Sequence, residues 1–243
     1  MMKRIATILL TFVLSTPIFA ARPAPRFIPL FNGRDFSGWK LPVGDNGHWK
    51  VIDGVIDYDA RSEATGSKDL WSEKEYRNFI LRIDWRIKET TGLYSMPTVL
   101  PDGSHKKGAD GKDILTPTPN ADSGIYLRGS TKSQVNIWCW PIGSGEVYGY
   151  RMDKNMPASV RAGVTPKIHA DNPVGEWNRF EITLKGDRLT VALNGKTVIE
   201  NAELPDIPEK GPLGLQHHGG FKDGKYSPAS SLVQFRNISI TEL

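Results

Sequence analysis

The chain has 243 residues, of which 39% are hydrophobic and 24% are charged, and it contains one cysteine. This apolar content supports a large core and excludes a disordered chain, while a single cysteine excludes an intrachain disulfide framework and a multi-cysteine zinc site. The formal net charge of +4 is small and spread along the chain, so no dense basic run points to a nucleic-acid partner.

The first 20 residues have the three-part order of a secretory signal peptide. Lys3 and Arg4 give a positive start, residues 5–14 are apolar apart from two threonines, and Ala20 offers a small residue for cleavage. An apolar run of about 10 residues is too short to cross a bilayer comfortably. We therefore expect cleavage near Ala20, export to the periplasm or the cell exterior, and no membrane span in the mature chain.

Alternation of apolar and polar residues predicts strands along most of the remaining chain. In 79–88 every second residue is apolar, which indicates a half-buried strand, and 180–184 repeats the pattern. Asn194-Gly195 separates two alternating runs, as in a hairpin with a type I′ turn. The complete set of predicted strands is 50–56, 79–88, 123–128, 134–139, 180–184, 188–193, 196–199, 212–217 and 232–240.

Helical periodicity is nearly absent, because no segment keeps an apolar period of 3.6 residues over three turns. One short helical turn is predicted at 71–77. Many short strands with Gly/Pro-rich turns and no alternating helices indicate an all-β fold, a sandwich of two antiparallel sheets.

Residues 90–121 interrupt the strand pattern with four prolines and a polar stretch at 102–113. A long structureless segment inside a compact domain is usually a functional loop or a disordered insertion. Asp110 and Asp113, with the nearby glycines, suggest calcium ligands, but the EF-hand spacing is missing and a solvated loop is favoured.

The segment 30–39, Leu-Phe-Asn-Gly-Arg-Asp-Phe-Ser-Gly-Trp, closely resembles the opening motif of the 3-keto-disaccharide hydrolase family. Further matching motifs follow in the family's order at 122–129, 147–149, 173–178, 193–195, 214–219 and 235–238. The resemblance covers 27–243, so it implies one domain after the signal peptide, with 90–121 as an inserted loop. The implied fold is a concanavalin- or laminin-G-like jelly roll with a ligand groove on its concave face.

The chemistry that the resemblance implies starts from glycosides whose C3 hydroxyl is already a ketone. The C3 carbonyl acidifies the proton on C2, and its removal with loss of the C1 oxygen is a β-elimination. Addition of water then completes a net hydrolysis, and some members are described as a lyase plus a hydratase. Such a site needs a base at C2, an acid near the glycosidic oxygen, and donors or positive charge for the enolate.

A polar and aromatic set falls on one face of three predicted strands when their side chains alternate. Aromatic faces and planar polar groups are what sugar sites use, so we expect this face to bind a small carbohydrate. The set comprises Tyr126, Arg128, Gln134, Asn136, Trp138, Trp140, Gln216 and His218, and the family motifs add Asp122 and Tyr148 as substrate-binding residues.

Three residues are the catalytic candidates. Arg128 has a permanent charge and a rigid fork of donors that suit an enolate, with a surface salt bridge as the alternative. His218 could be an acid or base near neutral pH, or could hydrogen-bond the glycine turn that follows it. Glu146 lies in a Gly-rich turn and could be the C2 base if partial burial raises its pKa, or else an exposed carboxylate. By contrast, His217 is expected to point into the core or to the side opposite His218, and the tryptophans at 39, 49, 85 and 177 are expected in the core.

The chain departs from the family where the site matters. The family strand usually reads Glu-x-Gln-x-Asp, and these places hold Gln134, Asn136 and Trp138, while Asp122 stands where the family prefers Asn. Only Glu146 and Asp122 are predicted to replace the missing acids. A non-catalytic carbohydrate-binding module therefore stays open, whereas the absence of a Glu-x-Asp-x-x-Glu strand argues against a retaining glucanase.

The sequence requires no cofactor and leaves a divalent metal open. Its five histidines form no i, i+4 pair and no cluster with clear ligand spacing. His169-Ala170-Asp171 could supply ligands from a loop, although a solvated loop is the simpler interpretation.

Overall fold

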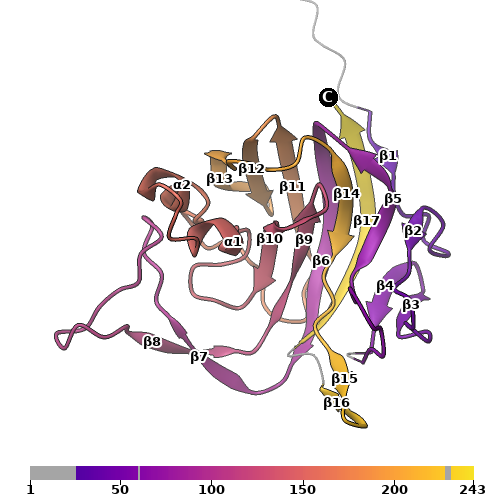
Figure 1. Cartoon of the computed structure of the whole chain (residues 1–243), viewed down its shortest axis with the longest axis horizontal. Helices are drawn as coiled ribbons and strands as arrows, with labels where there is room; N and C mark the ends of the chain where they lie inside the picture. The colour runs from indigo at the N-terminus through magenta and orange to yellow at the C-terminus, as the bar shows by residue number, and fades with distance from the viewer. Residues whose placement is uncertain (1–25, 60, 228–230) are drawn as a thin grey trace, which may run out of the picture.

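The computed structural model describes residues 26–59, 61–227 and 231–243, and it is built almost entirely of antiparallel strands (Figure 1). The predicted signal peptide at 1–20 lies outside the described residues. Across the described ranges, none of the helices has the length and apolar character needed to cross a membrane.

The larger of two sheets has eight strands and forms the back of the molecule. Its order is β13-β12-β11-β6-β17-β4-β3, with β1 paired to β17. These strands are β1 (Ile28–Pro29), β3 (Trp49–Ile52), β4 (Val55–Tyr58), β6 (Phe79–Thr90), β11 (Asn178–Lys185), β12 (Arg188–Leu193), β13 (Lys196–Glu203) and β17 (Ser231–Glu242).

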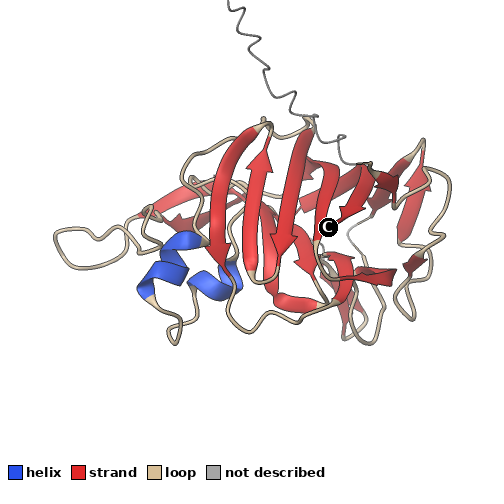
Figure 2. Ribbon diagram, turned by 90° about the horizontal axis from the view of Figure 1, so that it is seen from above, coloured by secondary structure: helices blue, strands red, loops and turns tan. Residues whose placement is uncertain are grey.

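A five-stranded sheet packs against the back sheet, in the order β10-β9-β14-β5-β2. Its members are β2 (Trp39–Lys40), β5 (Leu70–Tyr76), β9 (Asp122–Leu127), β10 (Ser130–Trp138) and β14 (Gly211–Leu215). We call the side of this sheet that faces away from the core the front face. Two short helices lie at one end of the sandwich (Figure 2): α1 (Tyr148–Arg151) packs against β10 and α2 (Ala158–Gly163) against β13.

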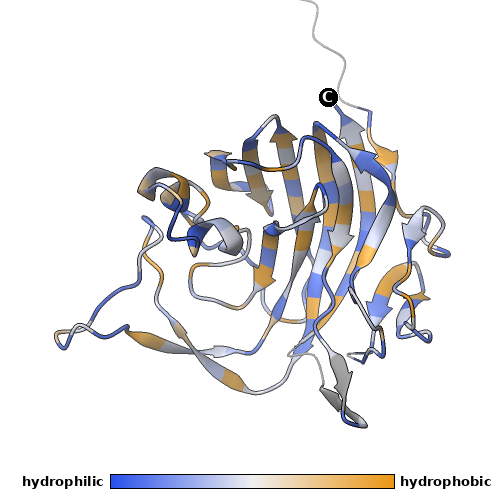
Figure 3. Cartoon of the chain, viewed as in Figure 1, coloured by the Kyte–Doolittle hydropathy of each residue, from blue (hydrophilic) through white to orange (hydrophobic). Residues whose placement is uncertain are grey.

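The core lies between the two sheets, and strand alternation explains it. Along β6 every second residue from Phe79 to Ile87 is at most 5% exposed, and Val135 and Ile137 of β10 are fully buried opposite them. The alternation is visible as bands of apolar and polar colour along the strands (Figure 3). The prediction of an all-β antiparallel sandwich is therefore confirmed.

Three of the four tryptophans expected in the core, at 39, 49 and 85, are buried. The fourth expectation is wrong, because Trp177 lies half-exposed at the surface. Two guanidinium groups contact its ring, with that of Arg236 3.8 Å and that of Arg86 4.8 Å from the ring centre. Cation–π contacts thus replace the burial that its apolar character suggested.

Two predicted segments have a different secondary structure. Residues 50–56 contain two strands, β3 and β4, because Asp53-Gly54 adopts positive φ values of 50° and 78° and turns the chain. The predicted helical turn at 71–77 is wrong: this segment is strand β5, paired with β14 and β2.

The segment 90–121 is an ordered ribbon rather than a structureless loop. Strands β7 (Leu93–Pro97) and β8 (Leu115–Pro119) pair over five residues. Beyond them, the bridges Val99–His105 and Lys107–Asp113 each close a short turn of their own. The ribbon extends from the body of the sandwich, and its tip returns toward α1 and α2 (Figure 1). A second small hairpin is formed by β15 (Gly220–Lys222) and β16 (Lys225–Ser227).

Candidate active site

The front face is organised by β9, which has β10 on one side and β14 on the other. Tyr126 pairs with Gln134 of β10 and with Gly214 of β14, and Gly214 in turn pairs with Trp71 of β5. The residues two positions away on each strand project to the same face. The outward-facing side chains predicted from β9, β10 and β14 therefore do share one surface, apart from Arg128.

An aromatic pair lies at the centre of this face. The Trp71 and Tyr126 rings stack with their centres 5.3 Å apart and 13° between their planes. Two glycines make room for flat side chains: a Cβ on Gly214 would lie 2.7 Å from the Trp71 ring, and one on Gly124 would lie 2.7 Å from Gln134. The two glycines thus let planar side chains lie flat on the sheet, where Tyr126 and Gln134 remain only 6% and 8% exposed.

A chain of amides runs beside the aromatic pair. The Gln134 Nε2 donates to Gln216 Oε1, and Asn136 Nδ2 donates to Gln134 Oε1 at 3.1 Å. The Tyr148 backbone N–H donates to Asn136 Oδ1 at 3.2 Å, which joins helix α1 to the network. These amides fix one another's orientation; Gln134 and Asn136 are buried, and Gln216 is the partly exposed member that could meet a hydroxyl group.

The β7–β8 ribbon contributes to an aromatic wall at the β10 end of the face. The Trp138 and Trp140 rings stack at 4.0 Å, and both meet Tyr148 edge-on at 5.9 Å. Tyr94 of β7 accepts a 2.6 Å hydrogen bond from Trp140 Nε1 and donates to the Ala121 carbonyl. Tyr148 is 39% exposed, so this wall has a surface available to a ligand.

Ionisable groups gather where β9, β14 and β5 meet at one end of the front face. His218 Nε2 lies 3.1 Å from Asp122 Oδ2, and both side chains are 39% exposed. Asp69, immediately before β5, accepts the His217 backbone N–H at 3.0 Å, and its charge interacts with that of His218. We call Asp69, Asp122 and His218 the front-face cluster.

The environment of the cluster shifts two pKa values. Burial raises the pKa of Asp69, an effect opposed by its hydrogen bonds from the His217 backbone and Ser67. Burial also raises the pKa of Tyr126, and the nearby carboxylates of Asp69 and Asp122 raise it further. Tyr126 therefore stays protonated at neutral pH and can donate a hydrogen bond to a developing negative charge.

Arg128 is not part of the front face, and the expectation that it lies beside Tyr126 is wrong. Strand β9 ends at Leu127, and Arg128 takes a φ of 50° as the first residue of the two-residue turn into β10. Its guanidinium is buried and donates to the Pro208 carbonyl at 3.0 Å and to Asn78 Oδ1 at 3.3 Å. Arg128 therefore holds the turn in place and does not contribute to the front face.

Glu146 is neither exposed nor partly buried: its side chain is completely inaccessible. The carboxylate pairs with Arg151 Nε, and Arg151 Nη1 continues to His105 Nε2 at 3.1 Å in the ribbon. Burial raises the pKa of Glu146 to about 7, against the lowering effect of Arg151. A base must touch its substrate, so this burial argues against Glu146 as the C2 base and makes it part of the link between α1 and the ribbon.

His217 points into the core as expected. It is 4% exposed, and its ring centre lies 4.3 Å from that of Tyr58 and 5.5 Å from that of Trp49. Burial lowers the pKa of His217 to about 4, so the ring is neutral at neutral pH.

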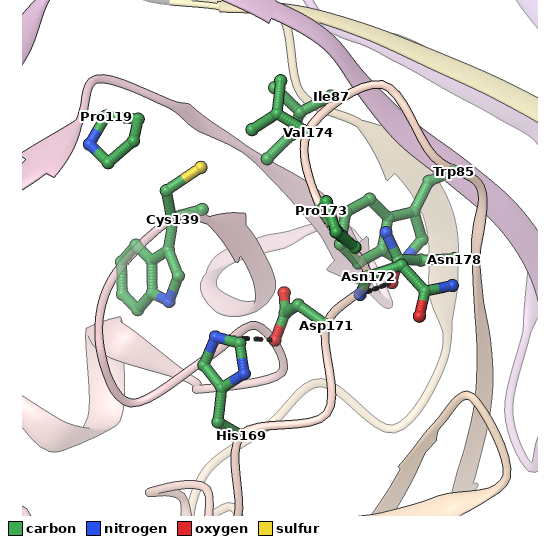
Figure 4. Close-up of a pocket in the computed structure, with 11 residues that line it drawn as sticks. Trp85, Ile87, Pro119, Cys139, His169, Asp171, Asn172, Pro173, Val174 and Asn178 are labelled. Atoms are coloured by element: carbon green, nitrogen blue, oxygen red, sulfur yellow. Dashed lines mark hydrogen bonds and ion pairs between the residues drawn. The ribbon is translucent and has the colours of Figure 1, made fainter.

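His169 and Asp171 line a hollow of about 280 Å³, which Trp138 of the aromatic wall also lines (Figure 4). The two side chains face each other with His169 Nε2 3.9 Å from Asp171 Oδ2, and burial raises the pKa of the nearby Cys139 thiol to about 11. Within the described part of the chain, no three His, Cys, Asp or Glu side chains come together as ligands for a metal ion. In the ribbon, Asp113 binds His105 and Lys107.

Sequence reasoning missed Asp69, Trp71 and Tyr94. Trp71 was hidden by the mistaken helical turn at 71–77, and Asp69 lies just before it; a strand alternating through Leu70 would have placed both on the front face. Tyr94 lies in the ribbon, where only the fold brings it to Trp140.

Comparison with known proteins agrees with this architecture. Two crystal structures from Parabacteroides distasonis ATCC 8503, each of a protein provisionally assigned as a glycosyl hydrolase, share the fold with TM-scores of 0.53. The first is 23% identical to this protein, over 89% of this chain and 94% of its own. The second is 21% identical, over 90% of this chain and 100% of its own. No curated protein matches the chain.

The fold is thus the jelly-roll β-sandwich that the motifs led us to expect. A family model described as a 3-keto-alpha-glucoside-1,2-lyase-like domain matches residues 26–241. Its carbohydrate-active character agrees with the aromatic and amide lining of the front face. The chain belongs to the 3-keto-alpha-glucoside-1,2-lyase-like, or 3-keto-disaccharide hydrolase, family.

Proposed function

We propose that this protein cleaves 3-keto-glycosides on its front face by removing the C2 proton, eliminating the C1 oxygen and adding water. The observation that carries the proposal is the His218–Asp122 pair, 3.1 Å apart and half-exposed beside an aromatic and amide surface. Family membership supports the substrate class. The predicted signal peptide supports action outside the cytoplasm, in the periplasm or the extracellular space.

His218 is the proposed base. When Asp122 accepts the proton on His218 Nε2, the neutral ring keeps its lone pair on Nδ1. The carboxylate also stabilises the imidazolium that forms after proton abstraction, as an acid next to a histidine does in other hydrolases. Asp122 is thereby a positioning residue, and it compensates for one of the carboxylates missing from β10.

Tyr126 and the amides are proposed to receive the charge that develops on the C3 oxygen. Proton removal at C2 turns the ketone into an enolate, whose oxygen requires donors already oriented toward it. The raised pKa of Tyr126 keeps its phenol protonated for this role. The stacked Trp71 and Tyr126 rings offer an apolar surface to the C–H bonds of the sugar.

The proposal is tested by incubating the protein with a 3-keto-disaccharide and with the same disaccharide unoxidised, and following both by NMR. We expect cleavage of the keto sugar alone. His218→Gln should lower kcat by about 100-fold or more, whereas His169→Gln, which changes an exposed histidine outside the front face, should leave it unchanged. Parallel reactions with a chelator and with added divalent metals establish any metal requirement. If neither sugar is cleaved across a set of keto-disaccharides with metals supplied, the proposal is wrong.

A non-catalytic sugar-binding module is the second candidate function. The observation that favours it is the amide row, Gln134 and Asn136, with Trp138 beyond it, at positions where the family usually carries acids. Calorimetric titration with the unoxidised and the oxidised disaccharide distinguishes the two candidates. Binding of both sugars without turnover of either would support the module.

A further inference from the structure

The front face continues beyond Trp71 into a hollow of about 350 Å³ at the β5–β2 edge. Trp71 pairs with Lys40 of β2, so the indole forms the boundary between the front-face cluster and this hollow. Apolar and polar side chains both line it, among them Lys40, Leu41, Pro42, Asp69, Trp71 and Pro212. Its volume accommodates one sugar-sized group beside the site that we assign to the keto sugar.

Asp69 is the one member of the front-face cluster that also lines the hollow. Its carboxylate is fixed from two sides, by the His217 backbone N–H at 3.0 Å and by the Ser67 hydroxyl at 2.9 Å. Ser67 also accepts a 3.1 Å hydrogen bond from Trp71 Nε1, which ties the carboxylate to the boundary residue. A glycoside that spans the boundary would therefore place the oxygen between its two parts near Asp69.

We propose that the leaving group of the glycoside binds in the hollow beyond Trp71 and that Asp69 donates the proton to the departing glycosidic oxygen. This assignment rests on the proposed function, and it adds the acid and the leaving-group site that the elimination needs. A catalytic acid has to carry its proton in the resting enzyme. Burial favours this form of Asp69 by raising its pKa, while the hydrogen bonds from the His217 backbone N–H and Ser67 and the charge of Lys68 act in the opposite direction.

The protons and electron pairs balance over the whole cycle. His218 takes the C2 proton, the electron pair passes through the C3 enolate into a C1–C2 double bond, and the C1–O bond breaks as Asp69 protonates the oxygen. In the hydration step a water molecule occupies the place of that oxygen. Asp69 takes a proton from the water as it adds to C1, and His218 returns its proton to C2. Both residues end in their starting forms, so no oxidant or further reactant is needed.

The test compares leaving groups of different basicity on Asp69→Asn. For a 3-keto-disaccharide, whose sugar alkoxide needs a proton to leave, we expect kcat to fall by about 100-fold. For 4-nitrophenyl 3-keto-glucoside, whose phenolate leaves as a stable anion, the loss should stay within about threefold. Asp110→Asn, which changes an exposed carboxylate at the ribbon tip, is the matched control, and circular dichroism shows whether each variant is folded.

The hollow is tested separately with Leu41→Asp. We expect this variant to raise KM for the disaccharide about tenfold at unchanged kcat and to leave KM for methyl 3-keto-glucoside unchanged, because a methyl group does not reach the hollow. If Asp69→Asn lowers kcat equally for the disaccharide and the nitrophenyl glucoside, or lowers it for neither, Asp69 is not the acid. Equal effects on both glycosides in Leu41→Asp would overturn the leaving-group site. Activity of Asp69→Asn on the nitrophenyl substrate keeps these outcomes distinct from failure of the proposed function, in which the wild type cleaves no keto-glycoside.

Discussion

Two buried ionisable groups, Glu146 and His217, are expected to change the stability of the protein with pH in opposite directions. Burial raises the pKa of Glu146 from its ordinary 4.5 to about 7, and it lowers that of His217 from 6.5 to about 4. Between pH 4.5 and 7 the folded state binds more protons than the unfolded state at Glu146, so stability falls as the pH rises. Between pH 4 and 6.5 the unfolded state binds more protons at His217, so stability rises with pH.

The size of each stability change follows from the difference between the pKa of the group in the folded state and its ordinary pKa. At about 1.4 kcal/mol per pKa unit, each group changes the free energy of unfolding by about 3 kcal/mol over its own range. The two contributions have opposite signs and overlap between pH 4.5 and 6.5, so they largely cancel in the wild type. Substitution of either residue should reveal the other.

The assay is urea unfolding followed by tryptophan fluorescence, at half-unit steps from pH 4 to 7.5. Relative to the wild type, Glu146→Gln should add a rise of up to about 3 kcal/mol with pH, and His217→Phe a fall of similar size. Any constant offset, such as the cost of leaving Arg151 unpaired, does not affect these slopes. Two variants with the wild-type profile, or with slopes of the same sign, would refute the reasoning.

Three further substitutions test other parts of the structure. Gly214→Ala should raise KM for the keto sugar about fivefold by pushing Trp71 off Tyr126. Gly66→Ala, which has open space around it, is its control, and an unchanged KM would contradict the stacking role. Tyr94→Phe removes the partner of Trp140 and should cost about 1 kcal/mol in thermal unfolding; an unchanged melting temperature would argue against it. Asn194 has a φ of 52°, so Asn194→Ala should lower the free energy of unfolding in urea by about 2 kcal/mol. If Asn194→Gly lowers it as much, strain in the left-handed backbone conformation is not the cause.

Much of the fold could be predicted because it depends on local patterns. The alternation along 79–88 and the Asn194-Gly195 turn both specify their structure within a few residues, and both are confirmed. Strand β5 was missed because three successive exposed polar residues, 73–75, break its alternation. They lie where the register with β14 shifts and β5 has two extra residues. The pairing that produces this shift lies some 140 residues away and leaves no local signal.

The candidate site was predictable only where strands continue in regular alternation. Tyr126, Gln134 and Asn136 were placed correctly because they lie within β9 and β10. Arg128 was misplaced because the strand ends one residue earlier, and the Gly129 that follows was the available sign of a two-residue turn. The burial of Glu146 depends on how α1 packs on β10, which no strand pattern encodes.

The order of strands in the five-stranded sheet has a consequence for how activity is acquired during folding. Asp69, Asp122 and His218 come from distant parts of the chain. Strand β14 lies between β5 and β9, so these two strands are joined into one sheet only after β14 has paired with both. Pairing at such sequence separation is slow compared with hairpin formation. In refolding experiments, the proposed turnover of 3-keto-glycosides should therefore return after the bulk of the β-structure signal, and it would report the completed insertion of β14.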